Sequence, residues 1–134
     1  MEILVNIDVN DAEKAIAFYR DALDLGVGRC LFNGSVIEMT GVSSKLYLLV
    51  KPSGTSASAR AEIYRTYRRH WTPVHLDFVV DDIAAAVQRA VSAGATLESD
   101  IRSSAWGLIA ILSDPFGHGF CLFQSTGKGY DEVA

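Results

Sequence analysis

The sequence has few cysteines and no long apolar run. It contains only Cys30 and Cys121, which are too few for the disulfide framework of a small secreted domain. No apolar segment approaches the roughly 20 residues that span a bilayer. The first residues, MEILVNIDV, lack the basic stretch and the apolar core of a signal peptide. These absences argue against disulfide-stabilised and membrane-spanning classes, and we expect a cytoplasmic protein.

A positive net charge is also missing. The chain has 12 Lys and Arg against 16 Asp and Glu, for a net charge of −4, so nothing draws it as a whole to nucleic acid or to an anionic membrane. We predict neither partner. One local exception is a short segment in which tyrosines are interleaved with arginines. We interpret this segment as a gate that attracts an anionic ligand or as a solvated helix laid across a sheet. Its basic residues are Arg60, Arg65, Arg68 and Arg69.

Two segments of the chain repeat one another. The stretch LVNIDVND (4–11) aligns with HLDFVVDD (75–82), and each leads through acidic residues into a helical pattern, over 12–23 and 83–91. The acidic residues suit helix N-caps, and a glycine follows each pattern as a stop. The apolar positions expected in the core are Ile7, Val9, Ile16, Leu76, Phe78, Val80, Ile83 and Val87.

After each helical pattern the apolar period changes from 3.6 to 2, which indicates strands. GRCLFNG, SVIEMTG and SKLYLLV read as three strands in the first half, and ATLESDIRSS, WGLIAILSD and HGFCLFQ read as three in the second. The chain is therefore expected to be βαβββ written twice. Module one covers 1–52, a Pro/Gly/Ser-rich linker covers 53–71, and module two covers 72–127. A tail over 128–134 is expected to be loosely held.

Two tandem modules with these strings resemble the vicinal oxygen chelate superfamily, which includes glyoxalase I, bleomycin-resistance proteins, fosfomycin-resistance enzymes and extradiol dioxygenases. The resemblance extends over about residues 3–125 and rests on VNDAEKAIAFYRDALDLG, HLDFVVDDIAAAVQRAVSAGA and SDPFGHGFCLFQ. It implies an α+β fold in which two tandem βαβββ modules form curved mixed sheets around a cleft, with the helices on the outer face. It also implies a homodimer with two equivalent sites.

The resemblance implies metal ligands at the first and last strand of each module. A catalytic zinc site normally has three protein ligands and a water, and only His75 matches the family pattern. We therefore predict a metal-free cleft with no cofactor. A rearranged divalent site that uses His75, Asp77 and either Glu38 or Cys121 stays open. The four equivalent places here hold Leu4, Tyr47, His75 and Cys121.

His75 and Asp77 are the most suggestive pair of polar residues. Strand side chains alternate between faces, so these two should point the same way. Asp77 could hold one ring nitrogen of His75 and leave the other as a base, or the pair could fix a ligand hydroxyl. The alternative is that Asp77 caps a backbone N–H and His75 only lines a wall.

Further residues are expected to line the pocket together with this pair. Trp71 in the linker and Trp106 in a loop could act as lids, although core packing or dimer burial would explain each equally well. The other predicted pocket residues are Asn6, Asp8, Tyr47, Cys121 and Phe123.

Two functions follow from these observations. One is a binding protein of the glyoxalase/bleomycin-resistance kind, which holds a small, partly apolar molecule in a metal-free cleft. The other is a lyase or isomerase of the glyoxalase type, either metal-dependent with a rearranged site or metal-free and using His75 and Asp77.

Overall fold

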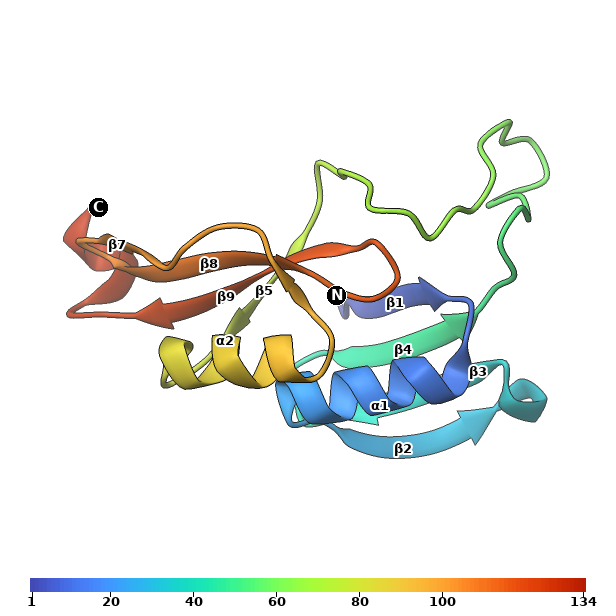
Figure 1. Ribbon diagram of the computed structural model, residues 1–134, viewed down its shortest axis with the longest axis horizontal. Helices are drawn as coiled ribbons and strands as arrows, with labels where there is room; N and C mark the ends of the chain where they lie inside the picture. Colours follow the sequence, from blue (N-terminus) through green and yellow to red (C-terminus); the bar gives the residue numbers. More distant parts are fainter. The chain divides into compact units, whose positions relative to one another are not determined.

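The chain folds into two units, each built from one helix and one mixed sheet. The computed structural model describes residues 1–134, and the units are Met1–Arg68 and Arg69–Ala134. Figure 1 shows the two sheets and the two helices. The predicted α+β class with two mixed sheets is confirmed. The predicted cleft between the sheets stays a prediction.

In the first unit, the first strand pairs with the last. The sheet order is β1-β4-β3-β2, in which β1 runs parallel to β4 and the other neighbours are antiparallel. A short 3-10 turn, Phe32–Gly34, joins the second and third strands. The elements are β1 (Leu4–Val9), α1 (Ala12–Leu23), β2 (Gly26–Leu31), β3 (Val36–Thr40) and β4 (Lys45–Val50).

Helix α1 begins at an aspartate cap, as the sequence predicts. The Asp11 carboxylate accepts the Lys14 backbone N–H at 3.0 Å, which satisfies one of the free donors at the helix start. The helix ends at Leu23, where the apolar pattern also ends, because Asp24 adopts a left-handed conformation with φ 57°. Its buried side chains follow helical spacing and are Ala15, Phe18, Tyr19 and Ala22.

The second unit repeats this topology with one difference. Its order is β5-β9-β8-β6, β5 runs parallel to β9, and β7 also pairs with β8. The elements are β5 (Leu76–Val79), α2 (Ile83–Ser92), β6 (Thr96–Leu97), β7 (Arg102–Ser104), β8 (Gly107–Ser113), β9 (Gly119–Ser125) and a 3-10 turn (Gly129–Glu132). Neither α1 nor α2 is long and apolar enough to cross a membrane.

The strand predicted over ATLESDIRSS is interrupted in the structure. The backbone N–H groups of Glu98 and Ser99 both donate to the Ile111 carbonyl, at 2.8 and 3.3 Å. The Ile111 N–H in turn donates to the Ser99 hydroxyl at 3.0 Å. Because two residues share one partner here, the ladder along β8 breaks, and β6 and β7 form in place of one strand.

The linker is not the helix that its polar sequence allowed. Residues Ser56 and Tyr64 form an isolated antiparallel bridge, and the Arg65 guanidinium binds the Asp8 carboxylate at 2.6 Å. The Tyr67 hydroxyl donates to the Lys51 carbonyl at 2.6 Å. These contacts tie the loop to the ends of β1 and β4.

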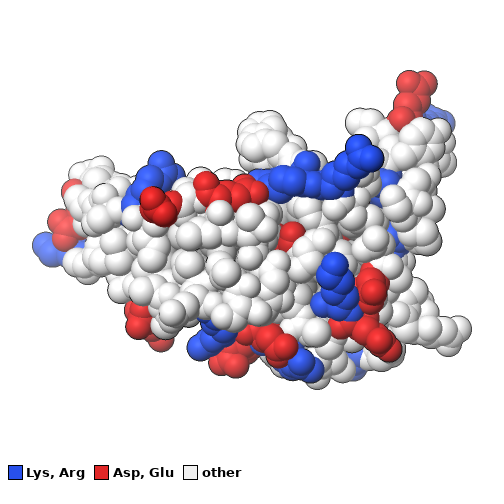
Figure 2. Space-filling model, viewed as in Figure 1, with Lys and Arg blue, Asp and Glu red and all other residues white.

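Acidic and basic side chains lie beside one another on the face shown in Figure 2.

We predict that the aspartate cap of α2 stabilises the second unit. The Asp82 carboxylate accepts the Ala85 N–H at 3.1 Å, so Asp82→Ala should lower the free energy of unfolding by about 1 kcal/mol in urea titrations. The matched control is Asp81→Ala at the exposed neighbouring position, for which we expect almost no change. Equal losses in the two variants would contradict the capping role.

Candidate functional site

Polar side chains at and beside β5 and β9 meet on one face of the second sheet. This is the face turned away from α2, and it is called the open face. His75 Nε2 lies 3.2 Å from Asp77 Oδ1, and Asp77 is the register partner of Cys121. The ligand atoms of the three residues lie within 4.8 Å of one another. Alternation turns Phe78 to the other face, where its ring contacts that of Phe120 at 5.9 Å.

Two members of this cluster, His75 and Cys121, line a pocket of about 320 Å³. This volume is near the lower end of ligand pockets and suits a small molecule. Trp71, whose side chain is 80% exposed, lies at its edge. The pocket therefore combines apolar walls with a few polar groups. Its lining includes Trp71, Thr72, His75, Ile111, Phe120 and Cys121.

An ion pair forms part of the pocket lining. The Arg69 guanidinium makes a bidentate contact with the Glu98 carboxylate, at 2.6 and 2.8 Å. These hydrogen bonds hold the pKa of Glu98 below its usual value, so the carboxylate stays ionised. Gly119 makes room for the guanidinium, because a Cβ there would lie 2.7 Å from an Arg69 nitrogen. Arg69 is thus already paired with an acid.

Cys121 is the buried member of the cluster. Burial, followed by the nearby Asp77 carboxylate, raises the pKa of its thiol to about 11. The thiol is therefore protonated at neutral pH and is a poor nucleophile.

The pairing of His75 with Asp77 determines what the imidazole can do. When Nε2 carries the ring proton, it donates to the Asp77 carboxylate and leaves the lone pair on Nδ1. His75 is half exposed, with 52% of its side-chain surface open. The Nδ1 atom can then accept a hydrogen bond from a ligand or take a proton from it.

His75, Asp77 and Cys121 each carry an atom that can ligate a metal ion. Zinc at its usual bond lengths would place tetrahedral donors roughly 3.3–3.8 Å apart. The His75–Asp77 separation of 3.2 Å is close to this, whereas the cluster as a whole extends to 4.8 Å. A divalent ion would also have to displace the proton of a thiol whose pKa is about 11. The donor set has enough members but does not fit a preformed zinc site.

The residues predicted in module one form a separate polar row. Asn6, Tyr47 and Glu38 are register partners across β1, β4 and β3, so Glu38 shares the face of the other two. Glu38 binds the Arg29 guanidinium at 2.6 Å, and this contact holds its pKa below the usual value. Asp8 is paired with Arg65. The carboxylates of Glu38 and Asp8 are therefore both held in ion pairs.

The aromatic residues predicted for the pocket are divided between two places. Trp71 lines the pocket beside His75, whereas Trp106 packs against Phe123 with ring centroids 5.7 Å apart. Tyr130 joins these two rings, at 5.7 Å from Phe123 and 5.6 Å from Trp106. Sequence reasoning missed Tyr130, because it lies in the segment expected to be loose.

The sequence analysis also missed a histidine pair. His118 Nδ1 lies 3.0 Å from His70 Nε2, and the His70 backbone N–H donates to the Gly117 carbonyl at 3.1 Å. These contacts fasten the segment that carries Trp71 to the turn before β9. The two histidines are 48 residues apart in the chain, so no local pattern joins them.

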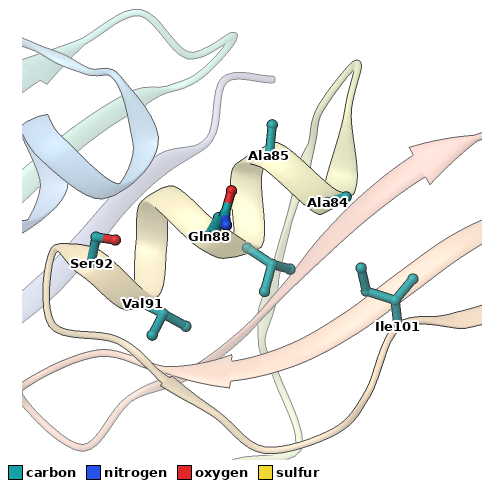
Figure 3. A pocket seen from close by; sticks show the side chains of 7 residues that line it. Ala84, Ala85, Gln88, Val91, Ser92 and Ile101 are labelled. Atoms are coloured by element: carbon teal, nitrogen blue, oxygen red, sulfur yellow. The ribbon is translucent and has the colours of Figure 1, made fainter.

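A second groove lies beside α2. It has a volume of about 520 Å³ and runs between the helix and the segment that carries Ile101 (Figure 3). Its lining contains no titratable side chain, and Gln88 and Ser92 supply its polar side-chain groups. Of the two pockets, the one that His75 lines has titratable side chains and the groove beside α2 has none.

The comparisons with known proteins show the family. A model of the glyoxalase-like domain matches residues 4–123, and the chain belongs to this family. An uncharacterized protein of Mycobacterium bovis is 41% identical over 64 residues, which is 46% of this chain and 42% of that protein. An uncharacterized protein of Mycobacterium tuberculosis H37Rv is 41% identical over 64 residues, or 38% of its length. The match thus spans less than half of these relatives.

Solved structures share the fold at low sequence identity. A glyoxalase-related enzyme from Fulvimarina pelagi has a TM-score of 0.71 at 17% identity and covers 93% of this chain and 88% of its own. A glyoxalase/bleomycin resistance protein/dioxygenase family enzyme from Burkholderia phytofirmans has a TM-score of 0.71 at 19% identity, with 92% and 97% covered. A fosfomycin resistance protein from Listeria monocytogenes has a TM-score of 0.69 at 14% identity, with 96% and 95% covered. The predicted superfamily is confirmed.

We predict that Asp77 suppresses the reactivity of Cys121. With a pKa of about 11, roughly one thiol in a thousand is ionised at pH 8. Iodoacetamide should therefore label Cys121 far more slowly than the exposed Cys30. Asp77→Asn removes a charge that raises the pKa, so labelling of Cys121 at pH 8 should become at least about threefold faster.

Peptide mass spectrometry measures both cysteines in the same sample. Asp100→Asn, at an exposed position, is the matched control and should leave both rates unchanged. Rapid labelling of Cys121 in the unaltered protein would show that the thiol is not suppressed.

Proposed function

We propose that this protein binds a small, partly apolar molecule in the pocket around His75, without a resident metal ion. The observation that carries the proposal is that His75, which lies within hydrogen-bond distance of Asp77, lines a pocket with apolar neighbours. Ligand pockets typically combine a mainly apolar lining with a few convergent polar groups. The imidazole Nδ1 and the Thr72 hydroxyl are the groups that would orient the molecule.

The charges around the pocket favour a neutral ligand over a strongly charged one. Arg69 is neutralised by Glu98, and the Asp77 carboxylate faces His75. An anionic ligand would meet the negative charge of Asp77. A cationic ligand would compete with His75 for the same carboxylate. A hydroxyl or carbonyl compound with an apolar body suits this arrangement. A homodimer with two equivalent sites and a cytoplasmic location stay predictions.

The His75–Asp77 pair also supports a second function, that of a metal-free lyase or isomerase. A histidine held by a carboxylate can act as a base toward a carbon acid or an electrophile. A compound that binds would be incubated with the protein and followed by mass spectrometry. Conversion that His75→Ala abolishes favours the enzyme, whereas binding without conversion favours the binding protein.

We predict that compounds identified by thermal melting will bind with an affinity that depends on His75 and Asp77. Neutral, partly apolar compounds are screened for those that raise the melting temperature, since a ligand of the native state stabilises it. His75→Ala and Asp77→Asn should each weaken binding of such a compound by about two- to tenfold, as the loss of one hydrogen bond implies. Asp100→Asn should leave the affinity unchanged. Equal affinity in all variants would place the ligand elsewhere.

The same melts test the metal-free part of the proposal. Tag-free protein is analysed for bound metals and melted with added zinc, nickel or manganese. We expect substoichiometric metal and no stabilisation that depends on His75. Near-stoichiometric metal, with a stabilisation that His75→Ala removes, would contradict this part and favour the rearranged site.

A further inference from the structure

The aromatic cluster of Phe123, Trp106 and Tyr130 is separate from the pocket lining, but Phe123 lies on the same face of the sheet as Cys121. Phe123 follows Cys121 by two residues, so both side chains point to the open face, roughly 7 Å apart along the strand. Phe123 is 7% exposed. It therefore offers a buried ring about two strand residues from Cys121 of the polar cluster.

Two aromatic rings and a glycine surround Phe123. Gly107 on the neighbouring strand leaves space for Phe123, because a Cβ at Gly107 would lie 2.6 Å from an atom of the Phe123 ring. Trp106 lies beside it with an interplanar angle of 30°. The Tyr130 ring stacks on Phe123 at an interplanar angle of 9° and a centroid distance of 5.7 Å.

Tyr130 covers the Phe123 ring but is itself open to solvent. Its side chain is 63% exposed, against 7% for Phe123 beneath it. The segment that carries Tyr130 is held by short-range bonds, such as Gly129 N–H to the Thr126 carbonyl at 2.8 Å and Val133 N–H to the Tyr130 carbonyl at 3.1 Å. Gly129 has φ 60°, a conformation that favours glycine. These bonds lie outside the ladder of the sheet, so their loss would leave the strand pairing intact.

We propose that Phe123 and Trp106 form a subsite for an aromatic ring of the ligand, and that Tyr130 covers this subsite as a displaceable lid. The inference rests on the proposed function, since it assigns the apolar part of the ligand to the same sheet face. It narrows the ligand class to molecules that carry a flat aromatic ring next to a hydroxyl or carbonyl group. A ligand ring that displaces Tyr130 takes over its stack on Phe123.

A competing lid lowers the apparent affinity by the fraction of molecules in which it is closed. Removal of the Tyr130 ring should therefore strengthen binding of an aromatic probe. We choose 2-naphthol, a neutral flat molecule with one hydroxyl. From the strength of aromatic pairs, we expect Tyr130→Ala to lower its dissociation constant by about two- to tenfold.

The measurement is an NMR titration of the indole N–H resonance. The chain has two tryptophans, so Trp71→Phe leaves Trp106 as the only indole reporter. Tyr130→Phe keeps the ring and should bind 2-naphthol as the parent does. Tyr64→Ala removes a tyrosine of equal exposure, 62%, from the other unit and should have no effect.

Intermolecular NOEs from 2-naphthol to the Phe123 ring in the Tyr130→Ala protein would support the subsite. Unchanged or weaker binding after Tyr130→Ala, or NOEs only to other residues, would overturn the proposal. His75→Ala added to Tyr130→Ala separates this inference from the proposed function. Binding at Trp106 that persists without His75 supports the aromatic subsite even where the His75 pocket fails its own test.

Discussion

The parallel pairing of β5 with β9 is the constraint on which the site depends. It sets Asp77 opposite Cys121, and the alternation of side chains places His75 and Phe123 on the same face. A shift of one residue in β5 would turn Asp77 toward α2 and bring Phe78 to the open face. The same shift in β9 would turn Cys121 and Phe123 toward α2 and bring Leu122 to the open face. The chemistry of the second unit is therefore a consequence of strand register.

The two units use the same topology for different purposes. In each, the first strand pairs in parallel with the last, and one helix begins at an aspartate cap. The open face of the first sheet commits its carboxylates to Arg29 and Arg65. The second holds a histidine–carboxylate pair beside a pocket. Membership in the glyoxalase-like family fixes the topology, whereas the residue types at these positions determine what each face can bind.

Periodicity alone predicted the helices, their caps and the shared face of His75 and Asp77, because these features depend on nearby residues. It could not predict contacts between distant segments. The His70–His118 pair, the stack of Tyr130 on Phe123 and the approach of Cys121 to Asp77 each depend on how strands far apart in the chain pair. The break between β6 and β7 was missed for the same reason, since it arises from hydrogen bonds to Ile111 on β8.

The central claim is that the ligand binds on the open face of the second sheet and is oriented by His75. A crystal structure of the protein with a stabilising compound tests this most directly. The account predicts density for the compound within hydrogen-bond distance of His75 Nδ1, with its apolar part toward Ile111 or Phe123. Density for the compound in the groove beside α2, against Gln88 and Ile101, would contradict it.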